Sequence, residues 1–401
     1  MRGNHRRIGR GVAGSLAMAL LLAGCGGGDS ATEAGAGAGS GDIVIGVPVG
    51  LSGANSVVAP SVVQASELAV DEINKAGGVL GRKIKLKVYD DRSGAEGAAQ
   101  AFTTAIIKDK VAAIVAMETS SARNAGQPIA AKTNTPYIYT SPYEGAACGA
   151  NLFLDGPVPV QMVEPSAQYF AEKFQAKTWF LIGSDYAYGR GQLAHVRSVV
   201  EAAGGKVVGE EYNPVDASDW SSILQKVRSA KPDAIATATA GGAPNVSFLK
   251  QWKQGGFEQP SLNLSLDEGT AETIGAAAEG VYFPSQYFTG IESEKNRAFL
   301  EALKAKFGAE AKTPNFLSVP QYYGIHLYAL AVEKAGSTTS AAVIKALPTV
   351  SFDGPAGPVS MNKQHHAGLN IWLGQADATG KTQITEDFGA VDPGAQCPDL
   401  K

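Results

Sequence analysis

The chain has 401 residues, enough for about two domains of ordinary size, and 44% of its residues are hydrophobic while 18% are charged. The first 24 residues carry four Arg and no acid, so the overall net charge of −4 leaves −8 on the remainder. This mildly acidic balance argues against a nucleic-acid-binding surface.

The N-terminus has the layout of an export signal. A basic region, MRGNHRRIGR, precedes a short apolar segment, VAGSLAMALLLAG, and no run in the chain is long enough for a comfortable membrane span. The LAGC that follows is similar to the lipobox of bacterial lipoproteins, which implies a signal peptide at residues 1–24 and a diacylglycerol on Cys25. A plain signal peptide with an incidental cysteine is the alternative. Lipidation would leave the protein exported and anchored to the bacterial membrane, in the periplasm or at the cell surface.

Residues 25–41 are rich in Gly and Ala and contain no aromatic residue, so we predict a flexible tether there. An exported domain meets an oxidising compartment, which makes the two remaining cysteines, Cys148 and Cys397, candidates for a disulfide. The competing interpretation is that either one is a lone buried thiol.

The next segment alternates short apolar runs with helical patterns. Strands are expected at residues 42–50, 83–91, 111–118 and 135–142, with helices between them. The first of these helices ends at Ala76, Gly77 and Gly78, because glycines are typical of a helix C-terminus. The order β-α-β-α-β-α-β predicts a parallel, doubly wound sheet.

The same rhythm restarts at KTWFLIGS, after which strands and helices alternate as far as PSLNLSL. A further strand, two helices and a hairpin-like pair of strands close the chain. We therefore predict an α/β protein of two doubly wound, Rossmann-like lobes joined by a multi-segment hinge. The expected N-terminal lobe is residues 42–155 and 282–350, and the C-terminal lobe is residues 156–281 and 351–401.

Local catalytic signatures are missing from the sequence. It contains no GxSxG, HExxH or GxxxxGK[ST], no GxGxxG after the first strand, and no CxxC. His365 and His366 are adjacent, and adjacent residues on a strand point to opposite faces, so a metal pair there is disfavoured. We expect neither enzymatic activity nor a cofactor or metal.

Polar residues gather where strands end. The stretches METSSARN (117–124), YIYTSPYEG (137–145), GSDYAYGR (183–190) and LSLDEG (264–269) each follow or close a predicted strand. Ligands bind outside the carboxyl ends of strands in such sheets, and a cleft between two lobes is the default site. Helix capping, by Ser120 or Ser121 for example, explains each stretch equally well by itself.

These motifs carry a resemblance to a known family. GVPVGLSGANS, DEINKAGGVLGRKIKLKVYDDRS and the two-lobed rhythm resemble the type I periplasmic binding proteins over residues 42–395. SPYEG, NLFLDGPVPVQ, GSDYAYGR and NVSFLKQWK look more like the urea and short-chain amide branch, and the branched-chain amino acid receptors are close relatives.

The resemblance implies ligand contacts from Ser120, from Tyr139 and Ser141 beside Pro142, and from Tyr186 in the other lobe. Glu118 and Asp267 depart from the amide pattern; if they face the cleft, they favour a cationic group such as the amine of an amino acid. The alternative is that both carboxylates cap helices or face solvent. The candidate binding residues are Glu118, Ser120, Ser121, Tyr139, Ser141, Pro142, Tyr186 and Asp267.

The implied function is that of an extracytoplasmic solute-binding lipoprotein. It would capture a small polar ligand, of the amino acid, urea or short-chain amide type, by closing its lobes. Its partners would be the permease and ATPase subunits of an ABC importer, with no nucleic acid. The alternatives are a ligand-sensing receptor without a transport role and, less favoured, an exported α/β enzyme.

Overall fold

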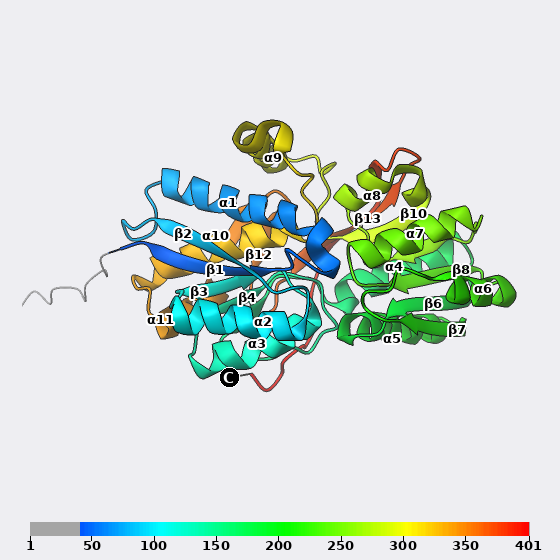
Figure 1. Ribbon diagram of the computed structural model, residues 1–401, viewed down its shortest axis with the longest axis horizontal. Helices are drawn as coiled ribbons and strands as arrows, with labels where there is room; N and C mark the ends of the chain where they lie inside the picture. The colour runs from blue at the N-terminus through cyan, green and yellow to red at the C-terminus, as the bar shows by residue number, and fades with distance from the viewer. Residues whose placement is uncertain (1–40, 401) are drawn as a thin grey trace, which may run out of the picture. The chain divides into compact units, whose positions relative to one another are not determined.

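The computed structural model describes residues 41–400 (Figure 1). The predicted signal peptide, the lipidation residue Cys25 and all of the predicted tether except Gly41 lie outside the described residues. Within that part of the chain, no helix combines the length and the apolar character that a membrane span needs.

The first sheet has five parallel strands in the order β2-β1-β3-β4-β5. Six of the seven residues of β1 are buried, because helices cover both faces of the sheet, as parallel sheets require. The strands are β1 (Ile43–Val49), β2 (Ile84–Asp90), β3 (Ala113–Ala116), β4 (Tyr137–Tyr139) and β5 (Leu152–Leu154). The helices between them are α1 (Ala59–Lys75), α2 (Ala95–Phe102), its continuation η2 (Thr103–Lys108) and α3 (Ser120–Lys132), and the short η1 (Ala54–Val57) precedes α1.

The second sheet has seven strands in the order β14-β13-β10-β9-β8-β6-β7, in which β13 alone runs antiparallel to the others, pairing with β10 on one side and β14 on the other. Its strands are β6 (Thr178–Ser184), β7 (Lys206–Asn213), β8 (Ala234–Ala238), β9 (Ser261–Asn263), β10 (Val281–Ser285), β13 (Leu369–Ala376) and β14 (Thr382–Val391). Its helices are α4 (Pro159–Lys173), α5 (Ala187–Ala202), α6 (Ser221–Ala230), α7 (Ala243–Gln254), α8 (Glu268–Ile274) and η3 (Gly275–Ala278). The predicted two-lobed α/β fold is confirmed; we call the elements around each sheet the first and the second lobe.

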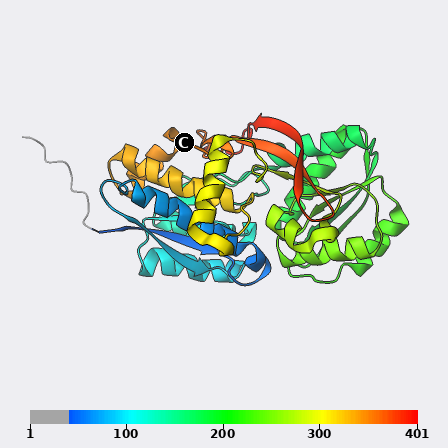
Figure 2. The same ribbon diagram turned by 90° about the horizontal axis from the view of Figure 1, so that it is seen from above.

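After β10 the chain returns to the first lobe. Figure 2 shows α9 and α10 lying beside α1, although more than 200 residues separate them in sequence. Tyr322 of α10 donates a hydrogen bond to Glu72 of α1 over 2.5 Å. The returning elements are α9 (Glu294–Phe307), η4 (Gly308–Glu310), α10 (Ser318–Ala335), α11 (Ser340–Ala346), η5 (Leu347–Thr349) and the hairpin of β11 (Ser351–Gly354) and β12 (Gly357–Ser360).

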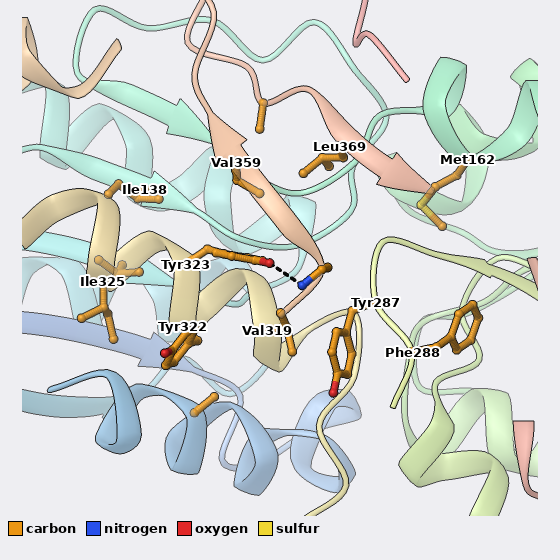
Figure 3. Packing of buried hydrophobic residues seen from close by; sticks show 14 of the residues in the cluster. Ile138, Met162, Tyr287, Phe288, Val319, Tyr322, Tyr323, Ile325, Val359 and Leu369 are labelled. Carbon is orange, nitrogen blue, oxygen red and sulfur yellow. Dashed lines mark hydrogen bonds between the residues drawn. The ribbon is translucent and has the colours of Figure 1, made fainter. Parts of the chain in front are cut away.

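The core is continuous where the chain crosses between the lobes. Apolar side chains of α10, the hairpin and the crossing segments pack together, and Tyr323 ties the hairpin to α10 by accepting from the Ala356 N–H over 2.7 Å (Figure 3). The same hydroxyl donates to the Gly357 carbonyl over 3.1 Å. Burying these rings and aliphatic chains contributes on the order of 2 kcal/mol for each side chain.

Two parts of the predicted lobe bounds differ from the observed packing. A boundary at 281/282 would divide β10, which pairs on both sides within the second sheet. The β11–β12 hairpin, predicted in the C-terminal lobe, is bonded to α10 of the first lobe. The hydrophobic pattern of a short strand does not reveal which sheet it will join; the other bounds stay predictions.

The C-terminal tail returns to the first lobe after β14. Cys397 forms a disulfide with Cys148, with the two Cα atoms 5.8 Å apart. Two hydrogen bonds flank it: the Ala146 N–H donates to Gln396 Oε1 over 2.9 Å, and the Cys397 N–H donates to Gln364 Oε1 over 2.6 Å. The tail is therefore fixed to the loop that follows β4.

We predict that replacing both cysteines, Cys148→Ser with Cys397→Ser, lowers the free energy of unfolding by about 2 to 4 kcal/mol, because the unfolded chain regains the freedom that the cross-link removes. Urea unfolding followed by circular dichroism measures this. Reduced wild-type protein should unfold at the same urea midpoint as the double variant. An unchanged midpoint in the double variant would contradict the prediction.

Candidate functional site

A cavity lies where strand ends of the two sheets meet. About 470 Å³ of empty space, part of it open solvent, lies between its walls. Both lobes contribute to its wall, and most of its lining is apolar or hydroxylated. The lining residues are Asn55, Val58, Met117, Glu118, Thr119, Ser120, Tyr139, Ser141, Pro142, Tyr186, Tyr188, Gly241, Ser265, Phe316 and Leu317.

The N-terminus of α3 forms one side of the cavity. Thr119 caps the helix, because its side chain accepts from the Ala122 N–H over 3.1 Å. Ser120 is 1% exposed, and its hydroxyl donates to Glu144 Oε2 over 2.6 Å. The first N–H groups of a helix have no acceptor within it, and the helix dipole adds positive potential there. This side can therefore receive a carbonyl or carboxylate oxygen.

The end of β4 is bonded directly to the end of β3. Ser141 Oγ accepts from the Glu118 N–H over 3.1 Å, and the Tyr139 hydroxyl donates to the Glu118 carbonyl over 3.1 Å. Pro142 follows and also lines the cavity. Parallel pairing brings both strand ends to the same edge of the sheet, which explains why these residues, 20 or more apart in sequence, meet.

The second lobe supplies the opposite side of the cavity. Tyr186 caps α5 by position, and its ring lies 5.9 Å from that of Tyr188. The Tyr188 hydroxyl donates to the Leu264 carbonyl, and Ser265 Oγ donates to the Thr239 carbonyl over 2.7 Å. Burial raises the pKa of Tyr186 well above its usual value, so its hydroxyl stays neutral.

Six of the predicted residues are brought together here: Glu118, Ser120, Tyr139, Ser141, Pro142 and Tyr186. Two lining residues that were not predicted, Tyr188 and Ser265, lie within the predicted motifs GSDYAYGR and LSLDEG. These motifs were therefore a signal for them. Phe316 and Leu317 precede α10 and have no local signal, because they reach the cavity only through the returning crossover.

Ser121 and Asp267 do not line this cavity. Asp267 caps α8: its carboxylate accepts from the Thr270 N–H over 3.1 Å and from Thr270 Oγ1, and Asn315 Nδ2 also donates to it over 2.8 Å. Ser121 lies in the first turn of α3 and is partly exposed. Asp267 is therefore a helix cap, which was the alternative to a ligand contact.

The Glu118 carboxylate is directed into the first lobe. It is 1% exposed, and Oε1 accepts a hydrogen bond from the Tyr137 hydroxyl. Burial, reinforced by the nearby Asp91 carboxylate, raises the pKa of Glu118 well above its usual value. Since the Glu118 carboxylate is bonded to Tyr137 and the Asp267 carboxylate caps α8, the expected preference for a cationic ligand loses its basis in both residues.

The model of the periplasmic binding protein family matches residues 42–381, most of the chain. The chain belongs to this family. Its members that resemble it are solute-binding receptors of ABC transporters, and a receptor of this kind acts outside the cytoplasm.

Similar proteins span nearly the whole receptor. The Leu/Ile/Val-binding protein BraC3 of Rhizobium johnstonii is 26% identical over 80% of this chain and 86% of the relative. The LivJ receptor of Streptococcus pneumoniae, solved in complex with isoleucine, is 26% identical, with a TM-score of 0.75 over 87% of this chain and 99% of that one. A solute-binding protein from R. palustris, solved with benzoate, shares the fold at 21% identity and a TM-score of 0.80, over 88% and 98% of the two chains.

Among residues 41–400, no group of three or more His, Cys, Asp and Glu side chains is arranged to hold an ion. His365 Nδ1 lies 3.0 Å from the Leu152 carbonyl, and His366 Nδ1 lies 2.5 Å from the Gln364 carbonyl. Both histidines thus lie within hydrogen-bond distance of main-chain carbonyls.

The buried carboxyl of Asp91, near Glu118, makes the stability of the protein depend on pH. Burial raises the pKa of this carboxyl to about 7, whereas an unfolded Asp ionises near pH 4. Between these values the unfolded chain binds fewer protons than the folded protein, so this group lowers stability as pH rises from about 4 to about 7.

Asp91→Asn removes that ionisation and can keep the bond that Oδ1 accepts from the Ser93 N–H over 2.7 Å. We expect the variant to exceed wild-type stability at pH 8 by up to about 4 kcal/mol, with the difference shrinking toward pH 4. Thermal and urea unfolding at both pH values measure it. A difference that does not change with pH would contradict the assignment.

Proposed function

We propose that this protein is the extracytoplasmic receptor of an ABC importer and that its ligand is a small solute with several N–H donors, an amino acid or a short amide. The observation that supports this is the direction of the hydrogen bonds around the cavity. Four hydroxyls of the lining already donate to neighbouring protein groups, so they present acceptors to the ligand. They belong to Ser120, Tyr139, Tyr188 and Ser265.

The directions follow from the partners. Tyr139, Tyr188 and Ser265 each meet a main-chain carbonyl, which can only accept, so each hydroxyl proton is used there. Ser120 meets the carboxylate of Glu144, which already accepts from Arg123. A ligand ammonium or amide N–H satisfies the oxygen lone pairs that remain, whereas a ligand made only of acceptors does not.

A smaller set of donors suits the other end of such a ligand. Ser141 Oγ accepts from the Glu118 N–H, which leaves the Ser141 proton for a ligand oxygen. The first turn of α3 adds main-chain N–H groups at the positive end of its dipole. A carboxylate or carbonyl placed here would leave its amine or amide nitrogen toward the acceptor hydroxyls.

Apolar side chains close the rest of the wall. Val58, Met117, Phe316, Leu317 and the Tyr186 ring offer a surface for a short aliphatic or aromatic body. The names of similar receptors, such as the Leu/Ile/Val-binding protein of Rhizobium johnstonii, agree with an aliphatic amino acid. The neutral lining also suits urea or a short amide.

Delivery would follow the general receptor mechanism. The ligand stabilises a closed arrangement of the two lobes by its differential affinity for it, and the importer permease and ATPase subunits use the loaded receptor. We further propose that a lipid on Cys25 holds the receptor at the membrane, on the strength of the LAGC motif. A sensing role without transport would use the same closure.

We predict that Tyr186→Ala weakens ligand binding at least tenfold without unfolding the protein, because it removes second-lobe contact area and leaves the buried cores intact. A thermal-shift screen with amino acids, urea, short amides and aromatic acids identifies the ligand, and calorimetry measures its affinity. Affinity unchanged in Tyr186→Ala for every ligand that binds would contradict the site.

Ser265→Ala tests the acceptor pattern itself. Loss of one acceptor should weaken ligands that carry an ammonium or amide by about 1 to 2 kcal/mol and affect a simple carboxylic acid much less. Ser229→Ala is the control, since that hydroxyl donates to the Gln225 carbonyl within the exposed part of α6. If benzoate-like acids without N–H groups bind best to the wild-type protein, the proposed ligand class is wrong.

A further inference from the structure

One contact beside the cavity joins the two lobes through a glycine. Gly191 lies in α5, just beyond Tyr186, on the second lobe. A Cβ built on Gly191 would lie 3.3 Å from the Glu144 Cα and closer still to its Cβ. Both neighbours are at the base of a side chain and cannot swing aside as the end of a long side chain can. Helix α5 therefore sits against Glu144 only because residue 191 has no side chain.

Glu144 itself belongs to the first lobe and is fixed there. Its carboxylate accepts from Ser120 over 2.6 Å and forms an ion pair with Arg123, whose side chain is 2% exposed. The guanidinium lies 5.0 Å from the Tyr139 ring and 5.2 Å from the Tyr143 ring, so aromatic faces hold it from two sides. The Glu144 side chain thus has two neighbours: its carboxylate is bonded to a hydroxyl of the cavity, and its Cα and Cβ lie against Gly191 of α5.

A second bond crosses between the lobes at the next residue. Gln192 Nε2 donates to the Tyr143 carbonyl over 2.9 Å, and Gln192 is fully buried. If the contact breaks, the Gln192 amide and the Tyr143 carbonyl must bond to water, and when it forms, both groups are buried and bonded to each other. Two successive residues of α5 therefore meet two successive residues of the loop after β4.

The loop on the first-lobe side has little room to withdraw. The Tyr143 N–H donates to the Pro157 carbonyl over 3.2 Å, and the Ala146 N–H donates to Gln396 over 2.9 Å. The disulfide at Cys148 ties the end of the same loop to the C-terminal tail. Separation of the lobes would therefore draw α5, with Tyr186 at its N-terminus, away from this loop.

We propose that Gly191 and Glu144 form the latch of the closed receptor: the missing side chain at 191 lets α5 seat on Glu144, and this seating brings Tyr186 onto the ligand. The proposal rests on the proposed function, because it assigns the residues that couple a filled cavity to lobe closure. Glu144 is a positioning residue here, acting through Ser120 and α5. Glycine is a poor helix former, and its presence inside α5 fits a position selected for closeness.

The test is Gly191→Ala in the full-length protein. Each lobe should fold normally, and the melting temperature without ligand should be unchanged or higher, since Ala favours the helix. Binding of the ligand found in the screen should weaken at least tenfold, and the ligand-induced decrease in radius of gyration, measured by small-angle X-ray scattering, should disappear. Gly290→Ala is the matched control, because a Cβ there meets nothing closer than 3.9 Å; it should bind and compact like wild type.

Gln192→Ala removes the side-chain amide that makes the crossing hydrogen bond and introduces no clash with Glu144, so it should weaken binding less than Gly191→Ala. Wild-type affinity and compaction in Gly191→Ala would overturn the latch while the proposed function stands. If no screened ligand binds wild type, the proposed function fails, and ligand-free scattering decides the latch. A ligand-free Gly191→Ala curve more extended than the ligand-free wild-type curve would support it, and a curve that matches wild type would overturn it.

Discussion

The site depends on one constraint of parallel sheets: all their parallel strands end at the same edge. In the first sheet, the ends of β3 and β4 are held together by the bonds that Ser141 and Tyr139 make to the main chain of Glu118. The chain must then leave that edge through helix N-termini and turns, which carry N–H groups and hydroxyls by necessity. A polar, pre-organised wall follows from the fold, and the second sheet supplies its counterpart.

The polarity of the cavity comes from bonds that face away from it. Hydroxyl protons are used on carbonyls and on Glu144 behind the wall, so the surface left to a ligand is rich in acceptors. The acids suggested by the sequence play a different part. Asp267 caps a helix, and Glu118 is buried against Tyr137, where its raised pKa favours the neutral form. Selectivity in such a cavity depends on hydrogen-bond direction more than on net charge.

Periodicity was sufficient to predict most strands and helices of the two lobes, the doubly wound lobes themselves and the strand ends that meet at the cavity, but it did not reveal β5, α4 or β14. Periodicity could not predict the contacts made by the segment that returns to the first lobe after β10. Phe316 and Leu317 look like ordinary core residues in the sequence, and the strand pattern of β10 fits either sheet. Glu118 and Asp267 show a related limit, because the same residue types cap helices, bury as neutral acids or bind ligands, and only the fold separates these outcomes.

The disulfide also sets an order of events in the life of the molecule. Cys148 and Cys397 are separated by 249 residues, a stretch that includes every element of the second lobe. During synthesis and export, the loop after β4 emerges long before the residue that will pin it. The first lobe can thus acquire its sheet early, but the surface carrying Glu144 reaches its final constraint only when the last few residues have emerged and met an oxidant. A chain shortened by even a handful of C-terminal residues would lose that constraint.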